Sequence, residues 1–433
     1  MSFSFLKFNN NLFRLQNRLF KTVFVADPKK SLFLQKLILR SNFARFLAIR
    51  EVTESSYYKK LSGIDGKFSL TLNERFQLNE FLKVNYNNWY FQNIKNISFV
   101  KENNKISYYK LPTIADRVWQ QLITFIISPS HEACFHPNNL GPRESISIYS
   151  SQKVILLNIN RHSFGYQKRI LFINLKDIFL NFHYRPLLSK ILAPRGIKIG
   201  IFRSFKMGFT PSFEKTCCFL SYLFANIIIS EIDKIHSSIR FGYDVLFFLK
   251  PLDNEKFIIN KLYLVLDSLK LSLRNLLTFR FFYVFEGFNF LGWHFSLNQD
   301  LDSFSTPSFY SYQLLLKRIK PIINNSNYGA NIKVSKISPL VKKWKIYNKY
   351  SIMTSYFLSL SKVQKNSFII FNKESSQDFY SVKRLINSCF NSFSINNEKQ
   401  ESDYSLYYNH IFFRYDISTK FIYSFCICCG IKE

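Results

Sequence analysis

The sequence is short of several residue types, and each shortage narrows what the chain can be. Glycine and proline are scarce, with 12 copies of each in 433 residues, and no segment repeats at a fixed period. The seven cysteines lack the spacing of a disulfide framework, which suits a reducing compartment. The apolar run 219–229 is shorter than the ~18 residues that a transmembrane helix needs, so the sequence predicts no membrane span.

Acidic residues are also few. The chain has 28 Asp and Glu against 59 Lys and Arg, which gives a formal net charge of +31. Such an excess repels itself unless a polyanion neutralises it, so nucleic acid is the expected partner and an anionic membrane surface is the alternative. The imbalance is greatest in residues 311–370, which hold eleven Lys or Arg and no Asp or Glu.

Phenylalanine is the most over-represented residue, with 49 copies. Phe, Asn, Ile, Lys and Tyr are all encoded by A/T-rich codons, so the composition indicates an A/T-rich genome such as that of an organelle. We expect a plastid in the first place and a mitochondrion in the second. The same codon bias adds to the lysine excess, so net charge alone does not establish a nucleic-acid partner.

The middle of the chain alternates strand-like and helix-like stretches. Residues 170–175 predict a buried strand, and residues 219–235 predict a buried helix. Residues 240–249 predict a hairpin with Tyr243 and Asp244 at its tip, and residues 287–297 predict a strand pair that turns at Gly292. This is the order of elements in a polymerase palm, although many folds share it.

Five blocks in a fixed order carry a more specific pattern. They are 47–66, ending in Gly-Ile-Asp-Gly, then 101–143, 221–233, 286–295 (EGFNFLGWHF) and 333–350 (KVSKISPLVKKWKIYNKY). The second block holds Pro112, Thr113, Ile114, Asp116, Arg117, Gln120, Pro129, Glu132, Phe135, Gly141 and Arg143. Together the blocks resemble the maturases encoded by group II introns, and the last one is similar to their RNA-binding segment, domain X.

The resemblance implies an α+β fold in which reverse-transcriptase-like fingers and palm are followed by an α-helical thumb and maturase region. We expect four parts: a basic N-terminal extension (1–40), degenerate fingers and palm (41–300), a basic helical thumb with domain X (301–390) and a C-terminal tail (391–433). The tail resembles a remnant of an endonuclease domain.

The resemblance also identifies positions where the chain departs from active polymerases. Active relatives carry aromatic-Ala-Asp-Asp at the hairpin tip, whereas this chain has Tyr243 before Asp244. The third acid of the family aligns with Asn174, and Asp177 takes its place only if a short deletion is assumed. Two divalent ions need carboxylate oxygens between them, so loss of two acids predicts a rate lower by about 10⁴ or more.

Two further parts of a nucleotide site are altered. Thr216, Cys217 and Cys218 stand where active relatives have Gln-Gly-Gly, and Ser107 stands where they have an arginine. We therefore predict that polymerase chemistry is lost and that Asp244 serves the turn rather than a metal. The alternative, Asp177 and Asp244 as metal ligands of an active reverse transcriptase, stays open here.

A basic surface is predicted beyond residue 310. On a helix over 340–350, Leu340, Val341, Trp344 and Tyr347 gather on one side, and Lys342, Lys345 and Lys349 lie almost opposite. A solvated helix face usually mixes charges of both signs, so one sign alone favours a polyanion. The predicted RNA-binding residues are Lys317, Arg318, Lys320, Lys333, Lys336, Lys342, Lys343, Lys345 and Lys349.

No metal site or cofactor is predicted. Cys426 and Cys429 form one Cys-x-x-Cys pair with His410 as the only nearby candidate, whereas zinc usually needs four ligands. The hypothesis is therefore an RNA-binding factor that helps group II or group III introns excise from organellar pre-mRNA, with other splicing proteins as further partners. The alternatives are an active intron-encoded reverse transcriptase and a structural organellar RNA-binding protein.

Overall fold

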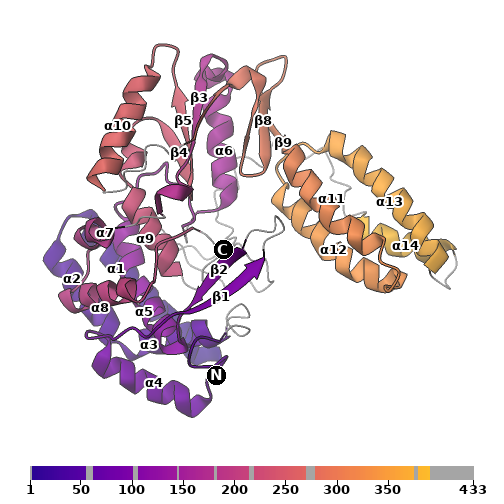
Figure 1. The fold of residues 1–433 in the computed structure, drawn as a ribbon. Helices are drawn as coiled ribbons and strands as arrows, with labels where there is room; N and C mark the ends of the chain where they lie inside the picture. Colours follow the sequence, from indigo (N-terminus) through magenta and orange to yellow (C-terminus); the bar gives the residue numbers. More distant parts are fainter. Residues whose placement is uncertain are drawn as a thin grey trace.

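The structure is a computed structural model that describes residues 2–54, 62–100, 106–143, 146–179, 183–213, 219–269, 278–374 and 379–390. The helices after residue 308 form a bundle set to one side of a larger body of helices and sheets (Figure 1). This mixture confirms the predicted α+β class. The predicted division at residues 40, 300 and 390 stays a prediction, and the C-terminal tail lies outside the described residues.

The first part of the body is helical. Its helices are α1 (Ser2–Phe24), α2 (Pro28–Arg40), α3 (Asn42–Glu54), α4 (Leu72–Asn85) and α5 (Ile114–Glu132). Thr71 and Glu74 form a reciprocal capping box that starts α4, and Asp27 caps α2. Helix α5 is buried along nearly its whole length because it packs against α1, α2 and α3. The strands β1 (Lys95–Val100) and β2 (Ile106–Leu111) form an antiparallel hairpin between α4 and α5.

A four-stranded antiparallel sheet with the order β4-β5-β3-β6 forms the rest of the body. Its strands are β3 (Arg169–Asn174), β4 (Ser238–Phe241), β5 (Asp244–Leu249) and β6 (Phe279–Tyr283). One face packs on α5, α9 (Phe219–Ile229) and α10 (Glu255–Ser268), and the other packs on α6 (Ile148–Ile159). The predicted strand and hairpin are confirmed, and Gly242 allows the tight turn with a φ of +62°.

Short elements connect these parts. They are η2 (Arg161–Ser163), η3 (Gly165–Gln167), η4 (Lys176–Phe179), α7 (Tyr184–Lys190), α8 (Arg195–Lys206), η5 (Ile232–Lys234) and η7 (Val284–Glu286). The predicted single helix over 219–235 was wrong at its end, because α9 stops at Ile229 and the chain continues into η5. There Asp233 accepts a hydrogen bond from Arg240 Nε at 2.7 Å.

A second antiparallel sheet leads out of the body. It contains β7 (Phe288–Phe290), β8 (Trp293–Leu297) and β9 (Ser303–Pro307). The predicted strand pair is confirmed, and Gly292 occupies its turn with a φ of +85°. The third strand, β9, has no counterpart in the sequence-based expectations.

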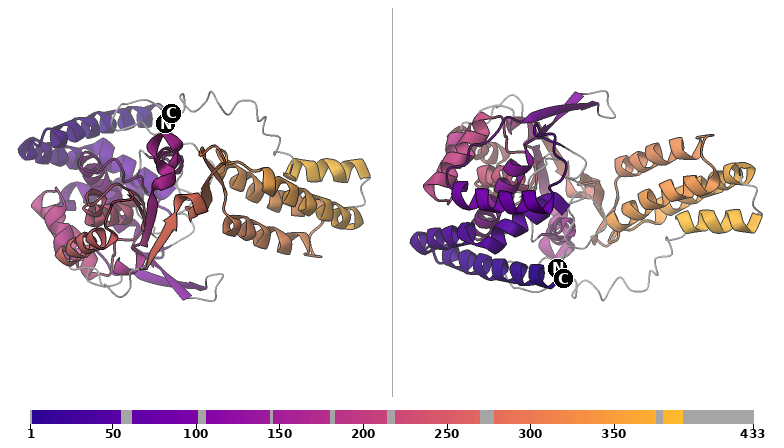
Figure 2. Two further views of the ribbon diagram at one scale, coloured as in Figure 1. Left: turned by 90° about the horizontal axis from the view of Figure 1, so that it is seen from above. Right: turned by 90° about the horizontal axis from the view of Figure 1, so that it is seen from below.

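The bundle consists of α11 (Phe309–Ile323), α12 (Ala330–Tyr347), α13 (Thr354–Glu374) and α14 (Phe379–Phe390), and it has its own apolar core. Both views in Figure 2 show it projecting from the body. Within the described ranges, the structure contains no helix with both the length and the apolar character that crossing a bilayer requires.

Side chains tie the bundle to the body. The rings of Trp293 and Tyr347 stack with their centroids 4.8 Å apart, and the Tyr347 hydroxyl donates to the carbonyl of Leu291. On α6, the Tyr149 hydroxyl donates to the carbonyl of Ile346 at the end of α12. The contacts from Trp293 and Leu291 and the contact from Tyr149 all reach the last turn of α12. The orientation of this helix is therefore defined by the body.

Candidate nucleic-acid interface

The tip of the β4–β5 hairpin is the position at which the resemblance to active polymerases would place metal ligands. Asn174 ends β3 and Asp244 begins β5, and the strand register sets them directly opposite each other. Asn174 Nδ2 donates to Asp244 Oδ1 at 2.5 Å, while Asn174 Oδ1 accepts from Lys176 N at 3.0 Å. Burial raises the pKa of the Asp244 carboxyl, and the hydrogen bond from Asn174 opposes part of that rise. Asp244 thus shares the site with a neutral amide.

Tyr243 fills the space beside this pair. Its ring centroid lies 4.9 Å from that of Phe213 and 5.4 Å from that of Phe179, in edge-to-face geometry. Its hydroxyl oxygen accepts a hydrogen bond from Phe213 N at 2.9 Å and lies 2.9 Å from Ser212 Oγ. The tyrosine therefore joins the hairpin tip to the segment 212–213 through both its ring and its hydroxyl.

Asp177 lies in η4 and is exposed, whereas Asp244 is partly buried at the start of β5. The described ranges contain no group of three or more His, Cys, Asp or Glu side chains that is arranged to hold a metal ion. Residues Thr216, Cys217, Cys218, His410, Cys426 and Cys429 lie outside the described residues. Ser107 belongs to β2.

A buried ion pair between Arg240 and Asp233 stabilises the β4–β5 hairpin. Arg240 of β4 is fully buried, and its guanidinium donates to both oxygens of Asp233 at 2.7 and 2.8 Å and to Asn226 Oδ1 at 2.8 Å. The guanidinium thus has three acceptors, two carboxylate oxygens and one amide oxygen. A buried charge needs such hydrogen-bond partners to offset the loss of water. This cluster fixes the hairpin without contributing any group to the tip.

The bundle presents the predicted basic residues in two different ways. Helices α11 and α12 bury an apolar stripe made by Tyr312, Leu315, Ile319, Ile337, Val341 and Trp344. Seven of the nine predicted residues are exposed: Lys317, Arg318, Lys320, Lys336, Lys342, Lys343 and Lys349. No Asp or Glu occurs between Asp302 and Glu374, so nothing in this segment neutralises them. We call these seven the bundle cations.

Lys333 differs from its predicted role. It lies on the buried stripe of α12, is 0% exposed, and donates from Nζ to the carbonyl of Ile323 at 2.7 Å. The carbonyl belongs to the last turn of α11, so the ammonium satisfies a helix C-terminus instead of facing solvent. Its position four residues before Ile337 is the signal that the sequence-based reasoning overlooked.

Lys345 also departs from the expected exposed face. It is partly buried in the last turn of α12, and burial lowers the pKa of its ammonium to about 8. Lys349 lies beyond the end of α12 at Tyr347, so it is exposed without belonging to the helix face. Of the three lysines expected opposite the apolar side, only Lys342 is an exposed helix residue.

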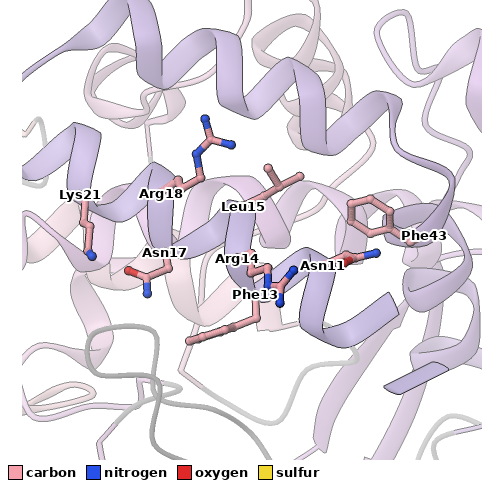
Figure 3. A pocket seen from close by; sticks show the side chains of 8 residues that line it. All are labelled: Asn11, Phe13, Arg14, Leu15, Asn17, Arg18, Lys21 and Phe43. Carbon is pink, nitrogen blue, oxygen red and sulfur yellow. The ribbon is translucent and has the colours of Figure 1, made fainter. Parts of the chain in front are cut away.

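A groove of about 530 Å³ along α1 was not foreseen. Its lining residues are Asn11, Phe13, Arg14, Leu15, Asn17, Arg18 and Lys21 of α1 and Phe43 of α3 (Figure 3). Arg14, Arg18 and Lys21 are exposed, and the buried Oδ1 of Asn17 has no hydrogen-bond partner in the described part of the chain. The sequence signal was the lack of any acid before Asp27.

Comparison with known proteins identifies the family. Residues 1–82 match the family model for the N-terminal domain of reverse transcriptase. "Maturase-like protein 1" of Euglena longa is 44% identical over 456 aligned residues, which cover 100% of this chain and 99% of that protein. "Maturase-like protein 1" of Euglena gracilis is 42% identical, with 97% of this chain and 94% of that protein covered. The chain belongs to the maturase-like protein 1 family. The resemblance to maturases and reverse transcriptases is thereby confirmed.

The structure gives physical roles to residues of the family pattern in this maturase-like chain. Glu132 and Arg143 form a buried ion pair, in which Arg143 Nε lies 3.0 Å from Glu132 Oε1. Gly141 has a φ of +143°, and a Cβ there would lie 2.7 Å from the ring of Phe241. These residues support the hairpin from α5 and the loop after it, so their role is structural.

Proposed function

We propose that this chain is an RNA-binding splicing factor that assists the excision of group II or group III introns from organellar pre-mRNA. The observation that carries the proposal is the bundle, whose exposed cations share a segment with no acid. Phosphates neutralise such a surface and release bound counterions, which makes binding favourable and dependent on salt. The printed names of the two Euglena relatives support a maturase-type role.

The protein would act by selecting among RNA conformations. A self-excising intron supplies its own reacting groups, so its partner needs to bind the folded RNA more tightly than misfolded forms. Cations held on a packed bundle suit that task, because they match one arrangement of phosphates better than others. We propose the bundle cations as the main RNA-binding residues, without Lys333, and the groove of α1 as a second cationic contact.

We further propose that polymerase activity is lost. Two-metal nucleotide transfer needs anionic oxygens shared between two ions. At the hairpin tip the structure offers Asp244, bonded to the amide of Asn174, and beside it the phenol of Tyr243. Hard divalent cations favour carboxylates and bind a neutral amide or phenol weakly. The packing of Tyr243 against Phe179 and Phe213 supports a structural use of this space.

The test is to crosslink the protein to RNA in its own organelle and to sequence the bound RNA. Enrichment of introns with their flanking exons, reduced in a variant with Lys342 and Lys343 changed to Ala, is the expected result. Recovery of ribosomal RNA without introns would replace the proposal by a structural role. The plastid is the expected compartment and the mitochondrion the second choice, and the organelle that yields the crosslinks decides between them.

Loss of polymerase activity is tested separately by primer extension on an RNA template with Mg²⁺. We expect no incorporation above that of the Asp244→Asn variant. Incorporation that the variant abolishes would instead establish an active reverse transcriptase, with Asp244 as a metal ligand.

A further inference from the structure

A second acid-free segment lies far from the bundle. Residues 178–213 contain six Lys or Arg and no Asp or Glu. Helix α8 occupies the centre of this segment, and Figures 1 and 2 place it on the side of the body away from the bundle. It buries Ile197, Gly200 and Ile201 against the body and exposes Arg195, Ile199 and Lys206. This face is therefore a surface separate from that of the bundle.

Tyr90 stands beside this face in a position that its neighbours define. The chain is irregular after α4, and Trp89 and Phe91 are buried at 3% and 4% exposure, whereas Tyr90 is 68% exposed. Trp89 is locked by a hydrogen bond from Nε1 to Asp116 Oδ1 at 2.8 Å and by stacking on Trp119. With both flanking side chains directed inward, the ring of Tyr90 is directed outward.

Arg203 of α8 covers one side of that ring. Its guanidinium carbon lies 3.8 Å from the Tyr90 ring centroid, and its Nη1 donates to Asn88 Oδ1 at 2.8 Å and to the carbonyl of Trp89 at 3.0 Å. These two hydrogen bonds hold the guanidinium plane in place. Because Tyr90 remains 68% exposed with one face covered, its other face is open to solvent.

We propose that Tyr90 and Arg203 form a stacking platform for an unpaired RNA base, with α8 attracting the adjoining phosphates. The inference rests on the proposed RNA-binding function and adds a class of substrate, single-stranded RNA, at a place remote from the bundle. An open aromatic face accepts any base because every base has a π-face. Proteins recognise unpaired RNA in this way, by stacking splayed bases on aromatic rings and arginine planes. Lys206 and Arg195 of α8 are exposed and supply positive charge from a segment that contains no acid of its own.

The platform is preorganised, which distinguishes it from a chance surface contact. Neither Tyr90 nor Arg203 needs to be ordered by the ligand, because the buried neighbours and the two hydrogen bonds already order them. A membrane surface is the competing partner, since α8 also exposes Ile199. RNA is favoured because a fixed aromatic plane is matched by a base, whereas a bilayer would require a continuous apolar strip.

The experiment compares the full-length protein with its Tyr90→Leu and Tyr90→Phe variants. Binding to a single-stranded RNA oligomer and to a duplex of the same sequence is followed by fluorescence anisotropy over a range of salt. Tyr90→Leu removes the ring, so we expect single-strand affinity to fall about tenfold, equivalent to about 1.4 kcal/mol. Its salt dependence and its duplex affinity should be unchanged, because no phosphate contact is lost. Tyr90→Phe keeps the ring and should bind as the wild type does.

Tyr283→Leu is the matched control, because Tyr283 is 49% exposed on β6, and it should have no effect. Wild-type single-strand affinity in Tyr90→Leu, with a bundle variant still losing its salt dependence, would overturn the platform and leave the proposed function intact. A wild-type protein that binds no RNA would overturn both. Binding to phosphatidylglycerol vesicles that Tyr90→Leu abolishes, with single-strand affinity unchanged, would overturn the platform in favour of a membrane contact.

Discussion

Replacing Lys336, Lys342 and Lys343 together by Ala tests the bundle surface directly. All three are exposed on α12, and each lies off the buried stripe that ends at Trp344. Alanine is a slightly better helix former than lysine, so the helix itself should be retained. The change removes three positive charges and only one ring contact, that of Lys336 Nζ at 3.6 Å from the centroid of Tyr328, so its main effect is on the electrostatic part of RNA binding.

The expected size follows from counterion release. Each phosphate contact contributes about −0.7 to −0.9 to the slope of log affinity against log salt. Three lost contacts should therefore flatten the slope by about 2 to 2.7. Between about 50 and about 200 mM salt, the wild type should then lose about 20- to 40-fold more affinity than the variant does.

The assay is a titration of an intron-derived RNA at several salt concentrations. The matched control replaces Lys250, Lys256 and Lys261, which are exposed around α10 and remove the same charge from another place. The control should change the slope much less, because long-range attraction is screened over about 8 to 10 Å. Equal slopes in the wild type and the α12 variant would refute the assignment of this helix to the RNA interface.

Three further outcomes are expected. Tyr243→Ala should lower the free energy of unfolding in urea by about 3 kcal/mol, because it leaves a cavity between Phe179 and Phe213. The control Phe285→Ala, at an exposed position, should lower it by less than about 1 kcal/mol. Equal losses in the two variants would contradict the packing role of Tyr243. Because the pKa of Asp244 is raised, the folded state binds more protons than the unfolded state above about pH 4, so stability should fall as pH rises through the folded pKa. Asp244→Asn should lack that part of the fall. Identical pH profiles of unfolding in the wild type and the variant would count against the raised pKa. Lys333→Ala should lower the free energy of unfolding by about 2 kcal/mol, because the Ile323 carbonyl loses a charged donor. The salt dependence of RNA binding should be unchanged. A flattened salt dependence would instead show that Lys333 contributes to RNA binding.

Sequence reasoning was most successful where the local pattern and the fold agree. The strand over 169–174 and both hairpins were predictable, because β-branched and aromatic runs end at residues suited to tight turns. The order of the elements and the substituted residues at the hairpin tip followed from the resemblance. What the resemblance could not supply was the use of Tyr243, since its bonds to Ser212 and Phe213 join segments 30 residues apart.

The lysines show a second limit. In an acid-free helix, composition treats every lysine alike, whereas packing separates Lys333 from Lys336 by the side of α12 on which each lies. The periodicity was readable for Lys333, but its exposed role was inferred from charge alone. The Tyr90–Arg203 contact joins residues 113 positions apart, and no local signal in the sequence links them.

The stacked Trp293 and Tyr347, with the hydrogen bonds from Tyr149 and Tyr347, determine how α12 meets any partner. These ties are complete in the folded chain, so the direction of the helix is established before a ligand arrives. A row of lysines on a loose tether would adapt to many partners and would lose conformational entropy with each. On an anchored helix the same lysines have a fixed spacing, and under the proposed function they would favour an RNA whose phosphates match that spacing.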